Sequence, residues 1–173
     1  MRVAVAEISD LDVLSDLWVE LARGQRAFGS HLHADENRAM VRASMARHVT
    51  FDGILVARAE TTSTPDGASP DAPDDVLGFV MFEVEMGTYE QDVTRGTVSN
   101  LFVRPDRRGE GVGSRLLEAA EDKLRDVGAD VVSLDVMAAN ESARRFYRRH
   151  GYRPHRIELE KSMQNDTHSK EDR

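Results

Sequence analysis

The sequence predicts a single domain of the α/β class. Stretches of strand length, rich in β-branched and apolar residues, alternate along the chain with longer stretches whose apolar residues recur at helical spacing. Their order is strand, two helices, three strands, helix, strand, helix, strand, and such interleaving is typical of α/β domains. The chain has 173 residues, which is enough for one domain with a core and too few for two ordinary domains.

The chain is expected to begin with a strand and a helix. Residues 3–8 alternate between apolar and other side chains, which predicts an edge strand. Ser9 and Asp10 are good N-cap residues, and leucines at helical spacing follow them. Gly24 and Gly29 are expected to end this helix.

A second helix, over residues 35–48, leads to the central part of the chain. The apolar residues expected on its inner face are Met40, Ala43, Met45 and Val49. Strands are predicted at residues 54–59, 76–86 and 94–103, the last two as antiparallel neighbours. Residues 61–75 are polar and rich in proline, so a flexible hairpin insertion is expected there.

The C-terminal part is expected to add two helices and two strands. Residues 112–127 form an amphipathic pattern that predicts a helix, and residues 131–137 are a β-branched, apolar run that predicts a buried strand. A short helix at 141–149 and a last strand at 154–163 follow. The tail, residues 164–173, is polar and expected to fray.

Composition limits the possible partners. The net charge of −8 argues against a nucleic-acid partner, since phosphate backbones are bound by basic surfaces. No apolar run approaches membrane-spanning length and the N-terminus lacks a signal pattern, so a cytoplasmic location without a membrane partner is expected. The absence of cysteine excludes disulfides, thiolate metal sites and a cysteine acyl-enzyme.

A glycine loop precedes the helix at 112–127. Gly109, Gly111 and Gly113 alternate with other residues between an apolar strand and the helix start. Glycine lets the backbone approach a ligand, and the free N–H groups of a helix start attract anions, so the loop is predicted to hold a phosphate. It lacks the lysine of a P-loop, and Ser114 stands where a dinucleotide fingerprint needs its third glycine.

Two motifs carry a resemblance to a known family. One is Arg108-x-x-Gly111-x-Gly113, and the other runs Asn-x-x-Ala-x-x-Phe-Tyr-x-x-x-Gly-Tyr over residues 140–152. In order and separation they resemble the two signatures of the GCN5-related N-acetyltransferase (GNAT) family. The resemblance covers residues 1–163, which are therefore expected to form one acetyl-CoA-dependent N-acetyltransferase domain.

The resemblance implies a fold and a cofactor site. The fold would be a mixed, mostly antiparallel sheet of about six to seven strands, with two central strands that splay apart and four flanking helices. The co-substrate, acetyl-CoA, would lie in the gap with its pyrophosphate on the glycine loop. The residues implied in binding it are Leu101, Phe102, Val103, Arg108, Gly109, Glu110, Gly111, Val112, Gly113, Ser114, Asn140, Ala143 and Tyr147. A homodimer is possible.

The resemblance also suggests catalytic residues. Tyr147 would protonate the departing thiolate, the other interpretation being a buried core tyrosine. Asp135, expected on a strand at the floor of the cleft, would deprotonate or orient the acceptor amine, or hold structure. Glu83 and Glu85 are weaker candidates. Without a cysteine, direct transfer is favoured over a ping-pong route.

The acceptor is not identified by the sequence. A loop at residues 25–36 follows the first helix, and His31 and Glu36 in it are expected to contact the acceptor, because specificity tends to reside on loops. A metal site at His31 and His33 is not favoured, since a lone His-x-His pair is weak evidence. Two functions remain open: an N-acetyltransferase acting on a primary amine of a small molecule or of a protein, and a non-catalytic acetyl-CoA-binding module.

Overall fold

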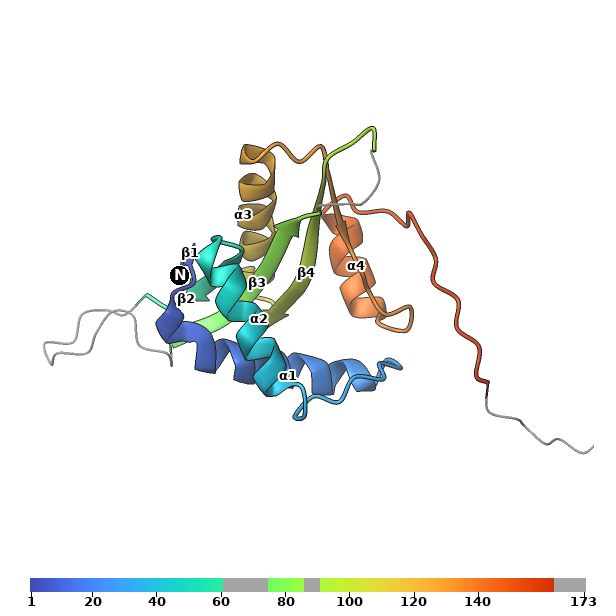
Figure 1. Cartoon of the computed structure of the whole chain (residues 1–173), viewed down its shortest axis with the longest axis horizontal. Coiled ribbons are helices and arrows are strands. Elements are labelled where there is room, and N and C mark those ends of the chain that lie inside the picture. The colour runs from blue at the N-terminus through green and yellow to red at the C-terminus, as the bar shows by residue number, and fades with distance from the viewer. Residues whose placement is uncertain (61–74, 86–90, 164–173) are drawn as a thin grey trace, which may run out of the picture.

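The computed structural model describes residues 1–60, 75–85 and 91–163, and within them five strands and four helices (Figure 1). In chain order these are β1 (Arg2–Val5), α1 (Leu11–Arg26), α2 (Arg38–Thr50), β2 (Ile54–Arg58), β3 (Val76–Val84), β4 (Arg95–Val103), α3 (Val112–Asp126), β5 (Val131–Leu134) and α4 (Glu141–Arg149). The tail at 164–173 and the predicted insertion at 61–75, except Asp75, lie outside the described residues. In the described ranges, no helix has the length and apolarity needed to cross a bilayer.

The strands form one mixed sheet in the order β1-β2-β3-β4-β5. The first three ladders are antiparallel and the last, between β4 and β5, is parallel. The α/β class, the mostly antiparallel sheet and the four helices are therefore confirmed. The expectation of six to seven strands is wrong for the described chain, because residues 154–163 pair with no strand there. Their alternating pattern provides an apolar face, but a strand also needs a neighbour that supplies hydrogen bonds.

Two apolar layers cover the two faces of the sheet. Alternate residues along β2 point to opposite faces, so Ile54 and Val56 join one core and Leu55 and Ala57 the other. Helices α1 and α2 contribute to the first core, and α3 covers the second. Partly buried residues of α4, among them Tyr147, pack against this second core. The site described below lies on that side.

The helices differ from the predicted ones in detail. Helix α1 continues through Gly24 to Arg26, because its buried face outweighs the intrinsic cost of one glycine. Of the inward residues expected in α2, Met45 and Val49 are buried, whereas Met40 is 72% exposed. The difference arises because α2 lies mainly against α1, and only its later turns reach the core beneath.

A buried ion pair joins the start of the chain to the sheet. Arg58 donates through Nη2 to both carboxylate oxygens of Asp10, at 2.6 and 2.8 Å. Asp10 also accepts a hydrogen bond from the backbone N–H of Glu7, at 2.8 Å, and makes no side-chain capping bond to α1, so the predicted cap instead anchors the turn before the helix. The pair fixes the turn between β1 and α1 against β2.

Candidate active site

The site begins where β4 and β5 separate. The parallel ladder joins residues 95–98 of β4 to residues 131–134 of β5 and then stops, although β4 continues to Val103. On the other side of β4 the register with β3 shifts at the same point, since Phe82 pairs with Val98 and Met81 with Asn100, leaving Ser99 as an extra residue. Such a bulge bends a strand and increases its twist. The expected splaying of two central strands is therefore present.

Beyond the bulge, two residues of β4 direct their backbone N–H and C=O groups toward this gap. Arg104 donates its N–H to Leu77 O at 2.9 Å, which makes these two residues a hydrogen-bonded pair with β3. Because such pairs alternate along an antiparallel ladder, Phe102 also faces β3 with its N–H and C=O. Leu101 and Val103 then present theirs on the opposite edge, where β5 has ended. These two residues can hydrogen-bond an extended ligand.

The glycine loop is preorganised by its backbone. Gly109 and Gly111 have φ of +84° and +81°, which glycine adopts without strain, and a Cβ on either would meet nothing within 4 Å. Gly111 is the N-cap of α3 and has no side chain that could satisfy the first-turn N–H groups. Those groups, together with the positive end of the helix dipole, form an anion site open to a ligand.

Arginine side chains border the loop. Arg108 donates through Nε to Val103 O at 3.2 Å, and its guanidinium lies 5.9 Å from the centre of the Phe102 ring. Arg107 lies within 3.8 Å of Glu110, so the carboxylate in the loop is paired rather than directed at an anion. The local charge at the loop is thus compatible with a phosphate, in spite of the acidic protein as a whole.

His150 joins α4 to the start of α3. Its Nδ1 lies 2.9 Å from Phe146 O, which can only accept, so Nδ1 carries the proton. In the neutral ring Nε2 then accepts from the hydroxyl of Ser114, 3.0 Å away. This contact with Ser114 could not be predicted from the sequence, because His150 occupies an unspecified position of the second motif. It orients Ser114 at the anion site.

Helices α3 and α4 also pack closely at Gly113. A Cβ on Gly113 would lie 3.5 Å from the Phe146 ring and 3.6 Å from Val103, so the helix start, α4 and the end of β4 meet there. Phe146 also stacks on His150, with ring centres 4.4 Å apart. These contacts make Phe146 a packing residue between α3 and α4.

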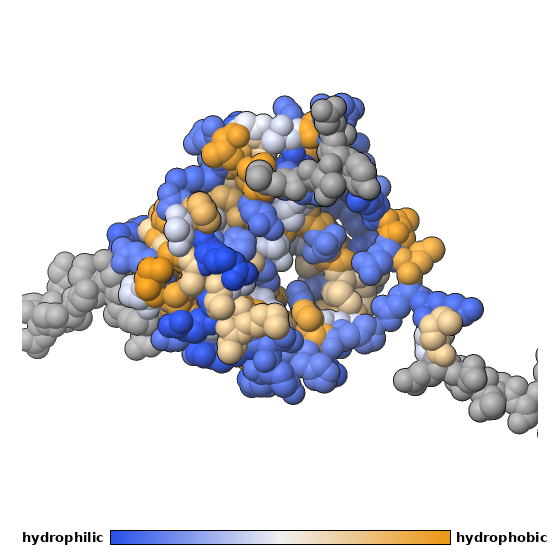
Figure 2. Space-filling view, in the orientation of Figure 1, coloured by the Kyte–Doolittle hydropathy of each residue, from blue (hydrophilic) through white to orange (hydrophobic). Residues whose placement is uncertain are grey.

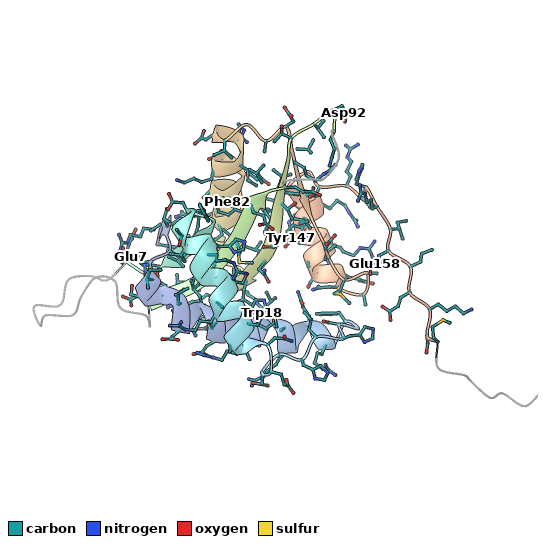
Figure 3. The ribbon with its side chains drawn as sticks, viewed as in Figure 1. Glu7, Trp18, Phe82, Asp92, Tyr147 and Glu158 are labelled. Atoms are coloured by element: carbon teal, nitrogen blue, oxygen red, sulfur yellow. The ribbon has the colours of Figure 1, made fainter. Side chains whose placement is uncertain are left out.

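Tyr147 lies on the side of α4 that faces the sheet (Figure 3). Its ring meets Phe146 and Tyr152 edge-on, at 5.2 and 5.8 Å between centres. Burial raises the pKa of Tyr147 to about 12. The phenol is therefore protonated throughout the neutral range and can act as a hydrogen-bond donor.

Asn140 caps α4 with its side chain. Its Oδ1 accepts from Ala143 N at 3.1 Å and from the hydroxyl of Ser142 at 3.0 Å. The carbonyl oxygen is thus used inside the protein, whereas the Nδ2 amide is the group with which Asn140 could bind a ligand. Ala143, one turn before Tyr147, is half-buried.

Asp135 is not on a strand, contrary to expectation. Strand β5 ends at Leu134, and Asp135 is the exposed residue after it. The strand is shorter than predicted because β4, its hydrogen-bonding partner, bends away at Ser99. The weaker candidates have partners: Glu83 lies 3.4 Å from His48, and Glu85 forms an ion pair with Arg95 at 3.4 Å.

The loop after α1 approaches the end of the β5 segment. A Cβ on Gly29 would lie 3.8 Å from Met137, three residues beyond the strand. His31 hydrogen-bonds Glu160 at 2.8 Å, and His33 lies 3.7 Å from Glu36; all four side chains are exposed. Within residues 1–60, 75–85 and 91–163, no group of three or more histidines and carboxylates is placed to hold a metal ion.

The sequence matches the model of the Acetyltransferase (GNAT) family over residues 21–152. An aminoalkylphosphonate N-acetyltransferase of Salmonella typhimurium is 29% identical over 51% of this chain and 57% of its own. An uncharacterized N-acetyltransferase of Archaeoglobus fulgidus is 28% identical over 85% of this chain and 89% of its own length. A mycothiol acetyltransferase of Clavibacter michiganensis is 34% identical over 84% and 42%. The chain thus spans less than two thirds of the Salmonella and Clavibacter relatives.

Solved structures share the fold. A tetramutant of the BH1408 protein from Bacillus halodurans superposes with a TM-score of 0.73 at 21% identity, covering 94% of this chain and all of that one. A NatC complex bound to Gag peptide and CoA gives 0.62 at 17% identity, covering 86% and 82%. At these identities the likeness concerns the fold alone.

The two buried phenols predict a loss of stability in alkali. Burial raises the pKa of Tyr147 to about 12, and burial with the hydrogen bond to Glu121 raises that of Tyr152 further. An unfolded tyrosine ionises near pH 10, so between roughly pH 10 and 12 the unfolded chain releases protons that the folded chain keeps. The free energy of unfolding should therefore fall as pH rises through this range.

Urea unfolding of the wild type and of the double variant Tyr147→Phe/Tyr152→Phe at pH 9, 10 and 11 measures this loss. The decrease from pH 9 to 11 should be smaller in the double variant, because phenylalanine does not titrate. Equal decreases in both proteins would show that other groups cause the loss.

Proposed function

The chain belongs to the GNAT family of acetyltransferases, and we propose that it transfers the acetyl group of acetyl-CoA directly to the primary amine of a small molecule. The observation that carries this proposal is the pairing of two adjacent features. One is the edge of β4 beyond Ser99, which presents backbone groups of Leu101 and Val103, and the other is the open glycine loop at the start of α3. Together they suit a ligand with an amide-containing arm and a pyrophosphate.

The residues of the chain fit this co-substrate. Leu101 and Val103 would pair with the pantetheine amides as a neighbouring strand does. The first-turn N–H groups of α3, that of Ser114 among them, would hold the pyrophosphate, with Arg108 beside it. Asn140 would donate its Nδ2 amide to a pantetheine carbonyl. The structural relative bound to CoA supports this use of the fold.

Acetyl-CoA would supply a thioester carbon that an amine can attack. The amine must be neutral, and Asp135 at the end of β5 would orient it or take its proton. A backbone N–H on the free edge of β4 would donate to the carbonyl oxygen as charge builds there. The proton balance closes because nitrogen releases one proton as the C–N bond forms and sulfur takes one as the C–S bond breaks.

Tyr147 would act on the departing sulfur. A thiol has a pKa near 8.5, about 3.5 units below that of Tyr147, so full transfer from the phenol is uphill by roughly 5 kcal/mol. Its contribution is then mainly a hydrogen bond that stabilises the thiolate. The proton that the amine releases balances the one that the sulfur finally takes up. This role needs a phenol that stays protonated, which burial provides.

The small-molecule acceptor is supported by relatives named for aminoalkylphosphonate and mycothiol. The test is release of free thiol from acetyl-CoA with a panel of small amines and of peptides with free N-termini or lysines. Turnover of small amines supports the proposal, and turnover of peptides alone would replace the acceptor class. Thermal stabilisation by acetyl-CoA without turnover of any amine would favour the non-catalytic binding module.

Gly111→Val should weaken CoA binding without unfolding the protein. Valine at φ +81° strains the loop and places a branched side chain where the phosphate must approach. Loss of one charge-assisted hydrogen bond costs about 1.5–3 kcal/mol, so Kd should rise roughly 10- to 100-fold. Isothermal titration with CoA measures this.

Gly128→Val is the matched control, since Gly128 has φ +90°, equally open surroundings, and lies just after the other end of α3. Gly111→Val and Gly128→Val should both be destabilised by about 1–3 kcal/mol, the cost of backbone strain. Only Gly111→Val should lose affinity for CoA. Equal CoA affinities in the two variants would refute the loop assignment.

Asn140→Asp should separate the capping role from cofactor binding. Aspartate caps as well as asparagine, so the melting temperature should hardly change, whereas Asn140→Ala should cost about 1 kcal/mol. Aspartate lacks the amide donor, and a lost hydrogen bond of about 0.5–1.5 kcal/mol should raise the Kd for CoA by roughly 2- to 10-fold. Unchanged affinity with intact stability would limit Asn140 to capping.

Asp135→Asn should move or flatten the acidic limb of the kcat/KM profile, because the substitution keeps the shape and removes the charge that would act on the amine. CoA affinity should stay the same. Glu83→Gln is the comparison, since Glu83 is paired with His48 away from β5. If the profile responds to Glu83→Gln and not to Asp135→Asn, the base is assigned to the wrong carboxylate.

Tyr147→Phe should lower kcat by a factor on the order of 10² while the Kd for CoA stays nearly constant, since only the hydroxyl is lost. Below pH 10 the alkaline limb of the kcat profile should have the same shape in the variant and in the wild type, because the phenol of Tyr147 does not ionise there. Tyr152→Phe is the control: its hydroxyl is bound to Glu121, and its loss should leave kcat intact. A variant with normal kcat and weakened CoA binding would make Tyr147 a binding residue.

A further inference from the structure

His150 stands between the ends of two helices. It is the C-cap of α4, and its ring reaches Ser114, the third residue of α3. The end of α4 carries the negative end of its helix dipole, whereas the start of α3 carries the positive end. A proton on the ring is therefore favoured from the side of α4 and opposed from the side of α3. An anion bound at the start of α3 would remove that opposition.

The carbonyl of Phe146 decides which ring nitrogen carries the proton. A continuing helix would give the backbone N–H of His150 to Phe146 O, but this N–H bonds Tyr147 O at 3.0 Å. Phe146 O accepts from Nδ1 of the His150 ring instead, at 2.9 Å. The other neutral tautomer would set two acceptors against each other there. In the neutral ring Nε2 is thus an acceptor, and the hydroxyl of Ser114, 3.0 Å away, gives it its only proton.

The neutral ring therefore withholds one donor from the anion site. The first helical hydrogen bond of α3 runs from Arg115 N to Gly111 O, at 3.1 Å, so the N–H groups of Ser114 and of the two residues before it are left for a ligand. The hydroxyl of Ser114 belongs to the same turn. While its proton is held by His150, its oxygen can meet an anion only with lone pairs, which is unfavourable.

We propose that His150 is a positioning residue of the coenzyme site, which takes up a proton from solution when the pyrophosphate of CoA binds; this inference rests on the proposed function. With a proton on Nε2 the ring donates to Ser114 Oγ, and the hydroxyl proton is released to donate to a phosphate oxygen. The charge of the imidazolium then lies one hydroxyl group away from the pyrophosphate. Histidine is suited to this role, since its charge ordinarily changes between pH 5 and 8.

The charged groups around His150 keep their charge in that range. Within the described chain, the ring lines an open hollow of about 360 Å³ that is also lined by Glu121 and Arg125 of α3, Asp130 before β5, and Tyr152 and Arg153 after α4. Two carboxylates and two guanidinium groups thus oppose each other, and neither kind of group ordinarily titrates near neutrality. Burial and the hydrogen bond to Glu121 raise the pKa of the Tyr152 phenol. On the loop side lie Arg108 and the pair of Arg107 and Glu110.

The coupling has a definite sign. Because the bound anion favours the charged ring, CoA binding and protonation strengthen each other by the same factor. The affinity for CoA should therefore rise as the pH falls through the titration of the ring. A charged hydrogen bond in place of none is consistent with a tenfold difference in affinity between the two states of the ring. The Kd for CoA should then fall roughly fivefold between pH 8 and pH 6.

The first test is isothermal titration with CoA at pH 6, 7 and 8, on the wild type and Ser114→Ala. The substitution leaves His150 in place and removes the hydroxyl through which it acts. The Kd of Ser114→Ala should match that of the wild type at pH 8 and be several-fold higher at pH 6. A merely structural role of Ser114 would weaken binding by the same factor at every pH. The 3′-phosphate of CoA itself titrates near pH 6, but its contribution is common to all the proteins compared.

His150→Leu separates the ring from the hydroxyl. Leucine can still pack on Phe146, but it frees the hydroxyl of Ser114 without supplying a charge. This variant should bind CoA at least as tightly as the wild type at pH 8 and more weakly at pH 6. His155→Leu, at an exposed histidine five residues further on, is the matched control and should follow the wild type at every pH. If His150→Leu does not fold, Ser114→Ala alone decides the test.

Two further measurements report on the protons directly. Titrations at pH 7 in two buffers of different ionisation enthalpy give the number of protons taken up with CoA, which should be larger in the wild type than in Ser114→Ala. Nitrogen NMR shifts of the His150 ring, in the protein without CoA at pH 8, should show the proton on Nδ1.

The outcomes distinguish this inference from the proposed function. Curves of Kd against pH that run parallel in the wild type and Ser114→Ala would overturn the role of His150 and leave CoA binding intact. A neutral ring with its proton on Nε2 would do the same. A wild type that binds no CoA at any pH would overturn both the proposed function and the coupling.

Discussion

The end of the parallel pairing between β4 and β5 is the constraint on which the rest of the site depends. The ladder stops at Val98 because β4 carries an extra residue, Ser99, that shifts its register and bends it. Beyond this point Leu101 and Val103 offer backbone groups to a ligand instead of to a strand. The same divergence shortens β5, so Asp135 begins a loop at the end of the gap. A straight β4 would continue its ladder with β5 and leave no gap between the two strands.

Contacts between α3 and α4 hold the two halves of the site together. His150 accepts a hydrogen bond from the hydroxyl of Ser114, the Phe146 ring covers Gly113, and Tyr152 donates to Glu121 at 2.8 Å. The first two contacts lie at the start of α3, where the anion site is, and the third lies near its end. The phosphate loop and the face of α4 that carries Tyr147 are therefore parts of one packed unit. Hydrogen-bond donors stabilise a transition state best when the fold holds them in place before the reaction.

The burial of Tyr147 and Tyr152 on this side of the sheet has two consequences for the ionisation of their phenols. It removes the phenols from water, which stabilises the fold at neutral pH and weakens it in alkali. It also keeps the proton on Tyr147 at every pH at which an amine acceptor is neutral enough to react. Beyond β5 the described residues form no further ladder, and the extended chain with Ile157 and Leu159 is exposed (Figure 2).

The sequence by itself determined the features that depend on short stretches of chain. The positive φ at Gly109 and Gly111, the cap at Asn140, the four helices and the order of the first five strands follow from local preferences, and the structure has them all. Tertiary structure alone decided where β5 ends, which places Asp135 in a loop, and that His150 meets Ser114. It also decided that the last predicted strand, residues 154–163, has no partner strand among the described residues. The reason is physical: a helix satisfies its hydrogen bonds within itself, whereas a strand exists only where another strand, of the same chain or of a second one, lies beside it.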